Sequence, residues 1–248
     1  MITIKTPGEI KIMRESGKIL ANVLQHLEKM TKPGITTIEL DRAAEALILS
    51  FGAKPAFKNY NKFPYSLCAS VNEIIVHGYP SGYILKDGDI IGLDLGVVCR
   101  GYYSNMATTI AVGKVSFKAK KLIADTKKAL MVGIKKVKIG NTIGDIGNAI
   151  QEYAEPKGYG IIRDLCGHGI GKDLHEDPQI PNYGKKGEGE KLVEGMVICI
   201  EPMLSMGDWR LKRSKDGYGY ATKDGSLSAH FEHTIAITQK GPLVLTLP

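Results

Sequence analysis

Three acidic residues lie in stretches of sequence that otherwise predict buried strands. Asp94 stands in the segment IIGLDLGVV, where strand alternation puts the large aliphatic side chains on one face and Asp94 on the other, between two glycines. Glu201 comes near the end of the apolar run MVICIEPM, and Glu232 interrupts the strand-like AHFEHTIAIT. An ionised carboxylate shielded from water is costly unless a cation or hydrogen bonds compensate it. A shared bound metal would explain all three residues.

His168 adds an imidazole to this set, in the segment CGHGIGKDLH. Its flanking glycines allow close backbone approach, and a neutral imidazole with several carboxylates suits manganese, iron, cobalt or zinc better than calcium. Each acid alone could instead form a structural ion pair or hydrogen-bond a strand end, and a lone histidine would mean little. The four residues together favour a metal centre.

Two helices are predicted to come before any strand. The sequence TPGE at residues 6–9 is a capping box, and apolar residues at helical spacing follow it as far as the stop at residues 32–34. A second helix is predicted from Thr36 or Thr37 to Gly52. Strands are then predicted in SLCASV and EIIVHG, joined at Asn72, and in DIIGLDLGVVC and YYSNMATTIAV, which turn near residues 100–101.

The same order of elements recurs in the second half of the chain. Helices are predicted over residues 117–137 and 142–153, and a strand-like IIRDLC leads into GHGIG. After a Gly-, Pro- and Lys-rich loop at 184–191, strands are predicted in MVICIEPM, GYGYAT and AHFEHTIAIT. The repeat predicts an internally duplicated α+β fold, mostly antiparallel, with its site where the halves meet. Without a linker between the halves, we expect one domain over residues 1–248.

Composition excludes several classes of protein. The 248 residues carry 33 basic and 26 acidic side chains, a net charge of +7, and the hydrophobic fraction of 43% is that of a folded globular chain. The four cysteines show no paired spacing, so we expect reduced thiols and no zinc knuckle. No apolar stretch reaches the roughly 18 residues of a membrane span and no signal peptide is recognised, which favours the cytoplasm. No sequence-specific DNA-binding motif is present.

Six segments together resemble one family. SVNEIIVHGYP, LDLGVV, CGHGIG, HEDPQIPNYG, CIEPM and SLSAHFEHT, in this order and over nearly the whole chain, are similar to type I methionine aminopeptidases of the bacterial kind. The resemblance implies a pita-bread fold, with two antiparallel-sheet halves and helices outside. It also implies a two-metal site, holding Co, Mn, Fe or Zn, that removes the N-terminal methionine from new polypeptides. Carried over to this sequence, it makes five positions the metal ligands: Asp94, Asn105, His168, Glu201 and Glu232.

The resemblance also implies roles for residues around the metals. Glu201 would act as general base and pass the proton of the attacking water to the leaving amine. His175 would contact the carbonyl oxygen and His77 the scissile amide or the residue after methionine, although capping or packing would also explain these two histidines. The methionine pocket would be walled by Tyr60, Phe63, Cys68 and Tyr218, with Tyr218 where a tryptophan is usual. Each of these four could equally belong to the core.

Asn105 departs from the family pattern, which has an aspartate eleven residues after the first ligand. An amide has one oxygen acceptor, no charge and an NH₂ group that cannot bind a cation, so it disfavours bridging two metals. The three remaining anionic ligands leave the set one charge short of two divalent ions. We therefore expect a weakened second site. Natural divergence and deliberate substitution are equally consistent with Asn105, which could also simply hydrogen-bond the strand backbone.

Two rival functions remain open. Loss of metal affinity would leave a catalytically weak or silent pita-bread protein that binds nascent chains or ribosomes, and relatives with this architecture include Xaa-Pro aminopeptidases. Two basic clusters could contact ribosomal RNA transiently, although a solvated helix face explains such lysines more often than not. A monomer is the default expectation. The clusters are Lys118, Lys120, Lys121, Lys127, Lys128, Lys135, Lys136 and Lys138, and Arg210, Lys212, Arg213 and Lys215.

Overall fold

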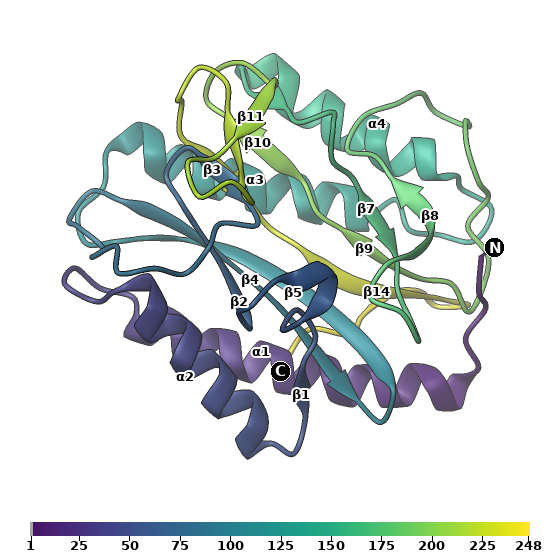
Figure 1. The fold of residues 1–248 in the computed structure, drawn as a ribbon. Coiled ribbons are helices and arrows are strands. Elements are labelled where there is room, and N and C mark those ends of the chain that lie inside the picture. The colour runs from purple at the N-terminus through teal and green to yellow at the C-terminus, as the bar shows by residue number, and fades with distance from the viewer. Residues whose placement is uncertain (1) are drawn as a thin grey trace.

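A computed structural model describes residues 2–248 and places pairs of helices on opposite sides of a layer of antiparallel strands (Figure 1). In Figure 1, α1 and α2 lie along the lower side, α3 and α4 lie along the upper side, and the strands run between them. Met1, the first residue of the predicted domain, lies outside the described residues. Among the described residues, no helix is both long and apolar enough to cross a membrane.

The first half forms as its caps and periodicity predict. Helix α1 (Pro7–Met30) begins at the capping box of Thr6 and Glu9, and α2 (Thr37–Ser50) at that of Thr36 and Glu39. They cover a sheet in which β4 (Ile90–Cys99) lies between β1 (Lys54–Pro55) and β2 (Leu67–Val71) and also pairs with β5 (Tyr102–Ala111). The apolar face of β4 packs into this half's core, so Asp94 faces the other way.

The second half repeats this order around its own core. Helices α3 (Phe117–Ile134) and α4 (Ile143–Ala154) pack against each other and precede a sheet of order β15-β14-β9-β7-β8. These strands are β7 (Gly167–Gly169), β8 (Glu176–Ile180), β9 (Val197–Ile200), β14 (His233–Thr238) and β15 (Gly241–Val244). Smaller sheets join β3 (Ile74–Val76), β11 (Leu211–Arg213) and β12 (Tyr220–Thr222), and β6 (Gly160–Ile161), β10 (Met203–Ser205) and β13 (Ser228–His230).

The two halves are joined where β5 meets the segment at residues 230–234. Asn105 and Thr234 exchange two hydrogen bonds, because the Asn105 N–H donates to Thr234 Oγ1 at 2.9 Å and that hydroxyl donates to the Asn105 carbonyl at 2.8 Å. The backbones of Ala107 and Glu232 bond to each other in the same way. This junction holds one predicted ligand from each half side by side.

The structure differs from the predicted elements in several places. The strand expected over IIRDLC is limited to β6, and the strand expected over AHFEHTIAIT is broken at residues 231–232. The predicted segments on either side of Asn72 form β2 and β3, which belong to different sheets, and Asn72 between them has a left-handed φ of 56°. Strands β8, β11 and β15 carry polar or proline-containing sequences that masked their strand character.

Candidate metal centre and peptide pocket

The structure brings all the predicted site residues around one cavity of about 1040 Å³. The ligand candidates come from both halves, with Asp94 on β4, Asn105 on β5, His168 on β7, Glu201 directly after β9 and Glu232 between β13 and β14. The expected catalytic and pocket residues line the same cavity, namely Tyr60, Phe63, Cys68, His77, His175 and Tyr218. The roles assigned to these residues stay predictions.

Asn105 uses its amide to join two carboxylates. In the pairing of β4 with β5, Asn105 stands opposite Gly96, which puts its side chain on the same face as Asp94. Its Nδ2 donates to Asp94 Oδ1 at 2.8 Å and to Glu232 Oε2 at 2.6 Å, and also reaches the Leu95 carbonyl at 3.3 Å. The amide NH₂ therefore stands between two acids at a place where only a cation or a hydrogen-bond donor is stable.

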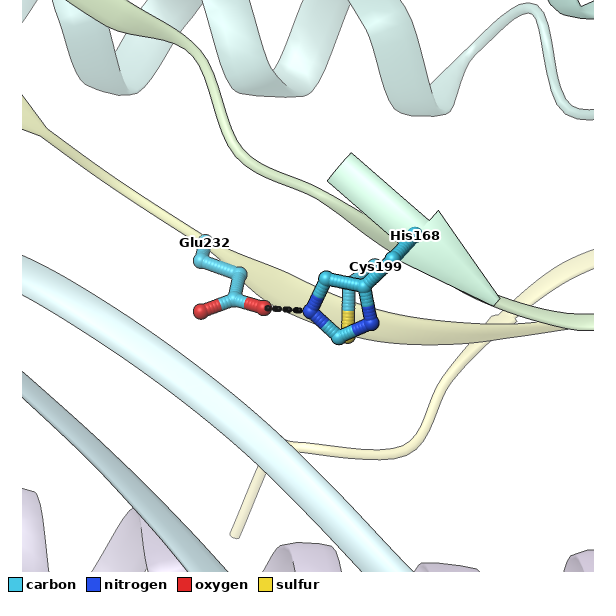
Figure 2. Close-up of side chains that lie close together, drawn as sticks. All are labelled: His168, Cys199 and Glu232. Carbon is cyan, nitrogen blue, oxygen red and sulfur yellow. Dashed lines mark ion pairs between the residues drawn. The ribbon is translucent and has the colours of Figure 1, made fainter. Parts of the chain in front are cut away.

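His168 turns one ring nitrogen toward the acids. Its Nδ1 bonds to the carbonyl of Gly169 at 2.8 Å, which requires the proton on Nδ1 and leaves the lone pair on Nε2. Nε2 lies 3.7 Å from Glu201 Oε1 and 3.9 Å from Glu232 Oε1, and Figure 2 shows the second of these contacts. These separations match two ligands held by one ion at bond lengths of roughly 2.0–2.2 Å.

Burial raises the pKa values of two of the acids, Asp94 and Glu232. Burial raises the pKa of Asp94 to about 6, and burial with the charges of Glu201 and Asp94 raises the pKa of Glu232 well above its usual range. Glu232 is 2% exposed, and its Oε1 makes no hydrogen bond of normal length to the residues that the structure describes. A divalent ion next to His168 would satisfy that oxygen and favour the ionised carboxylates, so the residues fit a metal.

Glu201 differs from the other acids because imidazoles surround it. Burial alone would raise its pKa, but His230, His168 and His77 outweigh burial and hold the pKa of Glu201 below its ordinary value. His230 Nε2 lies 3.5 Å from Glu201 Oε2. An ionised carboxylate is the state that a general base needs.

His175 is held by a tyrosine. The Tyr60 hydroxyl lies 2.7 Å from His175 Nδ1, and burial with the neighbouring His168 lowers the pKa of His175 to about 4. In the tautomer in which the Tyr60 hydroxyl donates to Nδ1, the ring's proton lies on Nε2. His77 has a left-handed φ of 60°, a backbone conformation that residues other than glycine seldom adopt. Burial lowers the pKa of His77.

Aromatic rings form the apolar wall of the cavity. Phe63 lies with its ring centroid 5.2 Å from Tyr218 and 5.3 Å from Tyr79, and Tyr79 stacks on Tyr218 at 4.8 Å. Cys68 is 4% exposed and pairs with Asp94 across β2 and β4, so it joins this wall to the acids. An apolar, shape-selective pocket next to the metal ligands suits an unbranched hydrophobic side chain.

Two buried side chains at this site, Cys199 and His230, were not predicted. Cys199 lies near Glu232, and His230 lies near Glu201. Strand alternation does not reveal these contacts, because β9 ends before Glu201 and the chain leaves the strand between His230 and Glu232.

Comparison with known proteins places the chain among metallopeptidases. The model of metallopeptidase family M24 matches residues 11–239. Methionine aminopeptidase of Clostridium acetobutylicum is 50% identical over 248 residues, which covers 100% of this chain and 99% of that protein. The crystal structure of methionine aminopeptidase from Rickettsia prowazekii has a TM-score of 0.98 at 43% identity and full coverage of both chains. The Xaa-Pro dipeptidase from Bacillus anthracis has a TM-score of 0.81 at 27% identity, and the match covers 99% of this chain and 62% of that chain.

Proposed function

Because this chain belongs to metallopeptidase family M24 and has the pita-bread fold, we propose that it is a methionine aminopeptidase that removes the N-terminal methionine from polypeptides in a metal-dependent reaction. Full-length relatives at about half identity carry that name, whereas the Xaa-Pro dipeptidase is more distant and considerably longer. The observation that carries the proposal is the convergence of His168, Glu201 and Glu232 beside an aromatic pocket, with one carboxylate oxygen of Glu232 unsatisfied.

The buried acids and His168 would hold the divalent ion. A bound ion polarises the scissile carbonyl and lowers the pKa of bound water to near neutrality. Glu201, kept ionised by its imidazoles, accepts the proton of the attacking water and delivers it to the leaving amine. His175 donates through Nε2 to the oxygen on which negative charge develops, and His77 contacts the scissile amide. The methionine side chain fits the pocket that Tyr60, Phe63, Cys68 and Tyr218 line.

Asn105 limits the number of ions. Its NH₂ group stands between Asp94 and Glu232, where a second ion would otherwise bind, so we propose one firmly held ion and a weak second site. Cobalt, manganese, iron and zinc all suit this mixture of imidazole and carboxylates. A catalytically silent binding protein is the second candidate, because the Asn105 NH₂ group already donates hydrogen bonds to the Asp94 and Glu232 oxygens that a cation would otherwise bind.

The remaining proposals concern compartment and partners. All four cysteines are free, which supports a reducing compartment such as the cytoplasm. We propose a monomer built as one domain. The predicted lysines of α3 and its C-terminal extension are all exposed and support transient contact with ribosomal RNA. Replacing Lys118, Lys120, Lys127 and Lys128 by glutamate should abolish salt-sensitive co-sedimentation with ribosomes, and unchanged binding would refute that contact.

Peptide hydrolysis tests the main proposal. Purified protein loaded with manganese, cobalt or iron should release methionine from Met-Ala-Ser and leave an Xaa-Pro peptide intact. Glu201→Ala should lose this activity, because the proton acceptor is gone. Cys99→Ser is the matched control, since Cys99 lies at the end of β4 outside the cavity. Cleavage of the Xaa-Pro peptide would favour the rival Xaa-Pro aminopeptidase, and no cleavage of either peptide with any metal would favour the binding protein.

A further inference from the structure

Cys199 places a thiol among the proposed metal ligands. Its Sγ, the His168 imidazole and a Glu232 oxygen lie within 4.8 Å of one another, and Figure 2 shows the Glu232 carboxylate directed at the His168 ring, which overlaps the Cys199 side chain in this view. Cys199 is 0% exposed, and its thiol contacts Thr234 Oγ1 at 3.5 Å and interacts with the Glu232 carboxylate. A thiol so weakly bonded leaves its sulfur available to another partner.

The surrounding ligand set lacks one anionic donor. Asn105 carries no charge and directs its NH₂ group at Asp94 and Glu232, so it offers no ligand atom on that side. On the other side, Nε2 of His168 faces Oε1 of both glutamates at 3.7 and 3.9 Å. A fourth donor near this point would supply the coordination number that zinc and cobalt prefer, and sulfur is a good donor to both.

We propose that Cys199 Sγ is a metal ligand. Cys199, His168 and Glu232 together bind the firmly held ion, with the Cys199 sulfur as a thiolate. The sulfur–metal bond forms as the S–H bond breaks, and the proton passes through the cavity to the buffer. Bond lengths of about 2.3 Å to sulfur and about 2.0–2.1 Å to nitrogen put two such ligand atoms roughly 3.5 Å apart, so side-chain shifts of about 1 Å suffice. The inference rests on the proposed function only for the presence of a divalent ion.

X-ray absorption of the zinc-loaded wild-type protein tests the bond directly. The expected result is a sulfur shell at about 2.3 Å in addition to nitrogen and oxygen at about 2.0–2.1 Å. A spectrum fitted by nitrogen and oxygen alone, with zinc bound at one equivalent, would overturn the proposal. No variant is needed for this measurement, so a folding defect cannot obscure it.

Cadmium titration identifies which cysteine supplies the sulfur. The wild-type protein should develop a sulfur-to-cadmium charge-transfer band that saturates at one equivalent, and Cys199→Ser should lose it while circular dichroism stays unchanged. Cys68→Ser and Cys99→Ser should keep the band, because only Cys199 lies in the group with His168 and Glu232; Cys68 is a buried thiol that lines the cavity, and Cys99 lies outside it. A band that survives Cys199→Ser would contradict the assignment, as would one lost only in Cys68→Ser.

The two proposals fail separately. Methionine release by a protein whose zinc has no sulfur ligand would leave the aminopeptidase standing and refute Cys199 as a ligand. A sulfur shell in a protein that releases no methionine would support Cys199 and refute the activity.

Discussion

Because Asn105 has an amide nitrogen where an aspartate would have a carboxylate oxygen, the centre of the site carries one negative charge fewer. The amide nitrogen stands where an aspartate would present an oxygen, and it satisfies Asp94 and Glu232 by hydrogen bonds in place of a cation. The backbone at this position is fixed separately by Thr234, so the side chain can be exchanged without moving the strand.

Asn105→Asp should therefore restore a second ion. The new carboxylate would repel the two neighbouring acids until a cation binds between the three. Mass spectrometry and calorimetry should show metal content rising from about one to about two ions per chain, and methionine release should accelerate. Asn105→Ala is the control, because it removes the donor without adding charge and should stay near one ion. Equal ion content in wild type and Asn105→Asp would contradict this account.

Tyr60→Phe tests how His175 is oriented. Without the hydroxyl, nothing on this side fixes the ring's proton on Nε2, and a hydrogen bond of about 0.5–1.5 kcal/mol is lost. We expect kcat to fall by roughly 2- to 13-fold with KM nearly unchanged, since the contact matters most as charge develops on the substrate oxygen. Tyr65→Phe is the matched control, because Tyr65 packs on Phe63 and not on His175. A rise in KM with kcat unchanged would mean that Tyr60 contributes to substrate binding and does not orient His175.

At the scale of the elements, α1 packs closely against the C-terminal segment. A Cβ at Gly17 would lie 2.3 Å from the Leu245 carbonyl oxygen, so only glycine allows the helix to approach this closely. Ser16 donates to the Val97 carbonyl at 3.0 Å and ties the same turn to β4, the strand that carries Asp94. The helix thus supports the ligand strand from behind.

Gly17→Ala should destabilise the fold although alanine favours helices. Overpacking against backbone costs about 1–3 kcal/mol, which exceeds the gain of about 1 kcal/mol in helix propensity. Gly8→Ala is the control on the same helix, because the nearest atom to its Cβ is 3.9 Å away. Urea unfolding should show a lower midpoint for Gly17→Ala only. Similar midpoints for the two variants would mean that α1 does not approach the C-terminal segment this closely.

Sequence patterns predicted these elements to different degrees. Capping boxes fixed the start of α1 at Pro7 and of α2 at Thr37, because the cap residues act locally. The strand over residues 229–238 was predicted whole, yet it breaks at 231–232. The break depends on Glu232 pairing with Ala107, a contact between distant parts of the chain that no local pattern contains.

For the whole molecule, acidity and metal compete for the same buried groups. Asp94, with a pKa raised to about 6, binds a proton at pH 5 and releases it by pH 7 in the metal-free protein. Because its folded pKa lies above the unfolded value of 3.8, the metal-free state loses stability as the pH rises from about 4 to about 6, and an ion that binds the carboxylate removes the loss. His175 and His233, both with pKa values lowered to about 4, act oppositely.

The thermal stabilisation given by metal should therefore grow with pH. We expect the difference in Tm between manganese-loaded and chelator-treated protein to increase from about pH 5 to about pH 7, because protons no longer compete for the ligands. His175 and His233 contribute to both forms and cancel in this difference. A difference that is constant or falls over this range would show that the acids do not bind the ion.

Much of the site could be predicted from the sequence, and one part could not. Buried acids in apolar strands pointed to Asp94, Glu201 and Glu232, and the structure brings them to one cavity. Cys199 and His230 were overlooked because a cysteine or histidine in an apolar run is most often plain core. Their closeness to the acids depends on packing between strands from separate segments, which alternation alone does not specify.

The reciprocal bonds between Asn105 and Thr234 have a consequence for how such a protein can change over time. The scaffold at this point does not depend on what the side chain carries, since the main chain alone provides one donor and one acceptor to Thr234. Replacing the amide by a carboxylate here changes the affinity of the site for metal ions and leaves the backbone hydrogen bonds of the fold unchanged. A single substitution at residue 105 can therefore change the number of metal ions that such a protein binds during evolution without altering its fold.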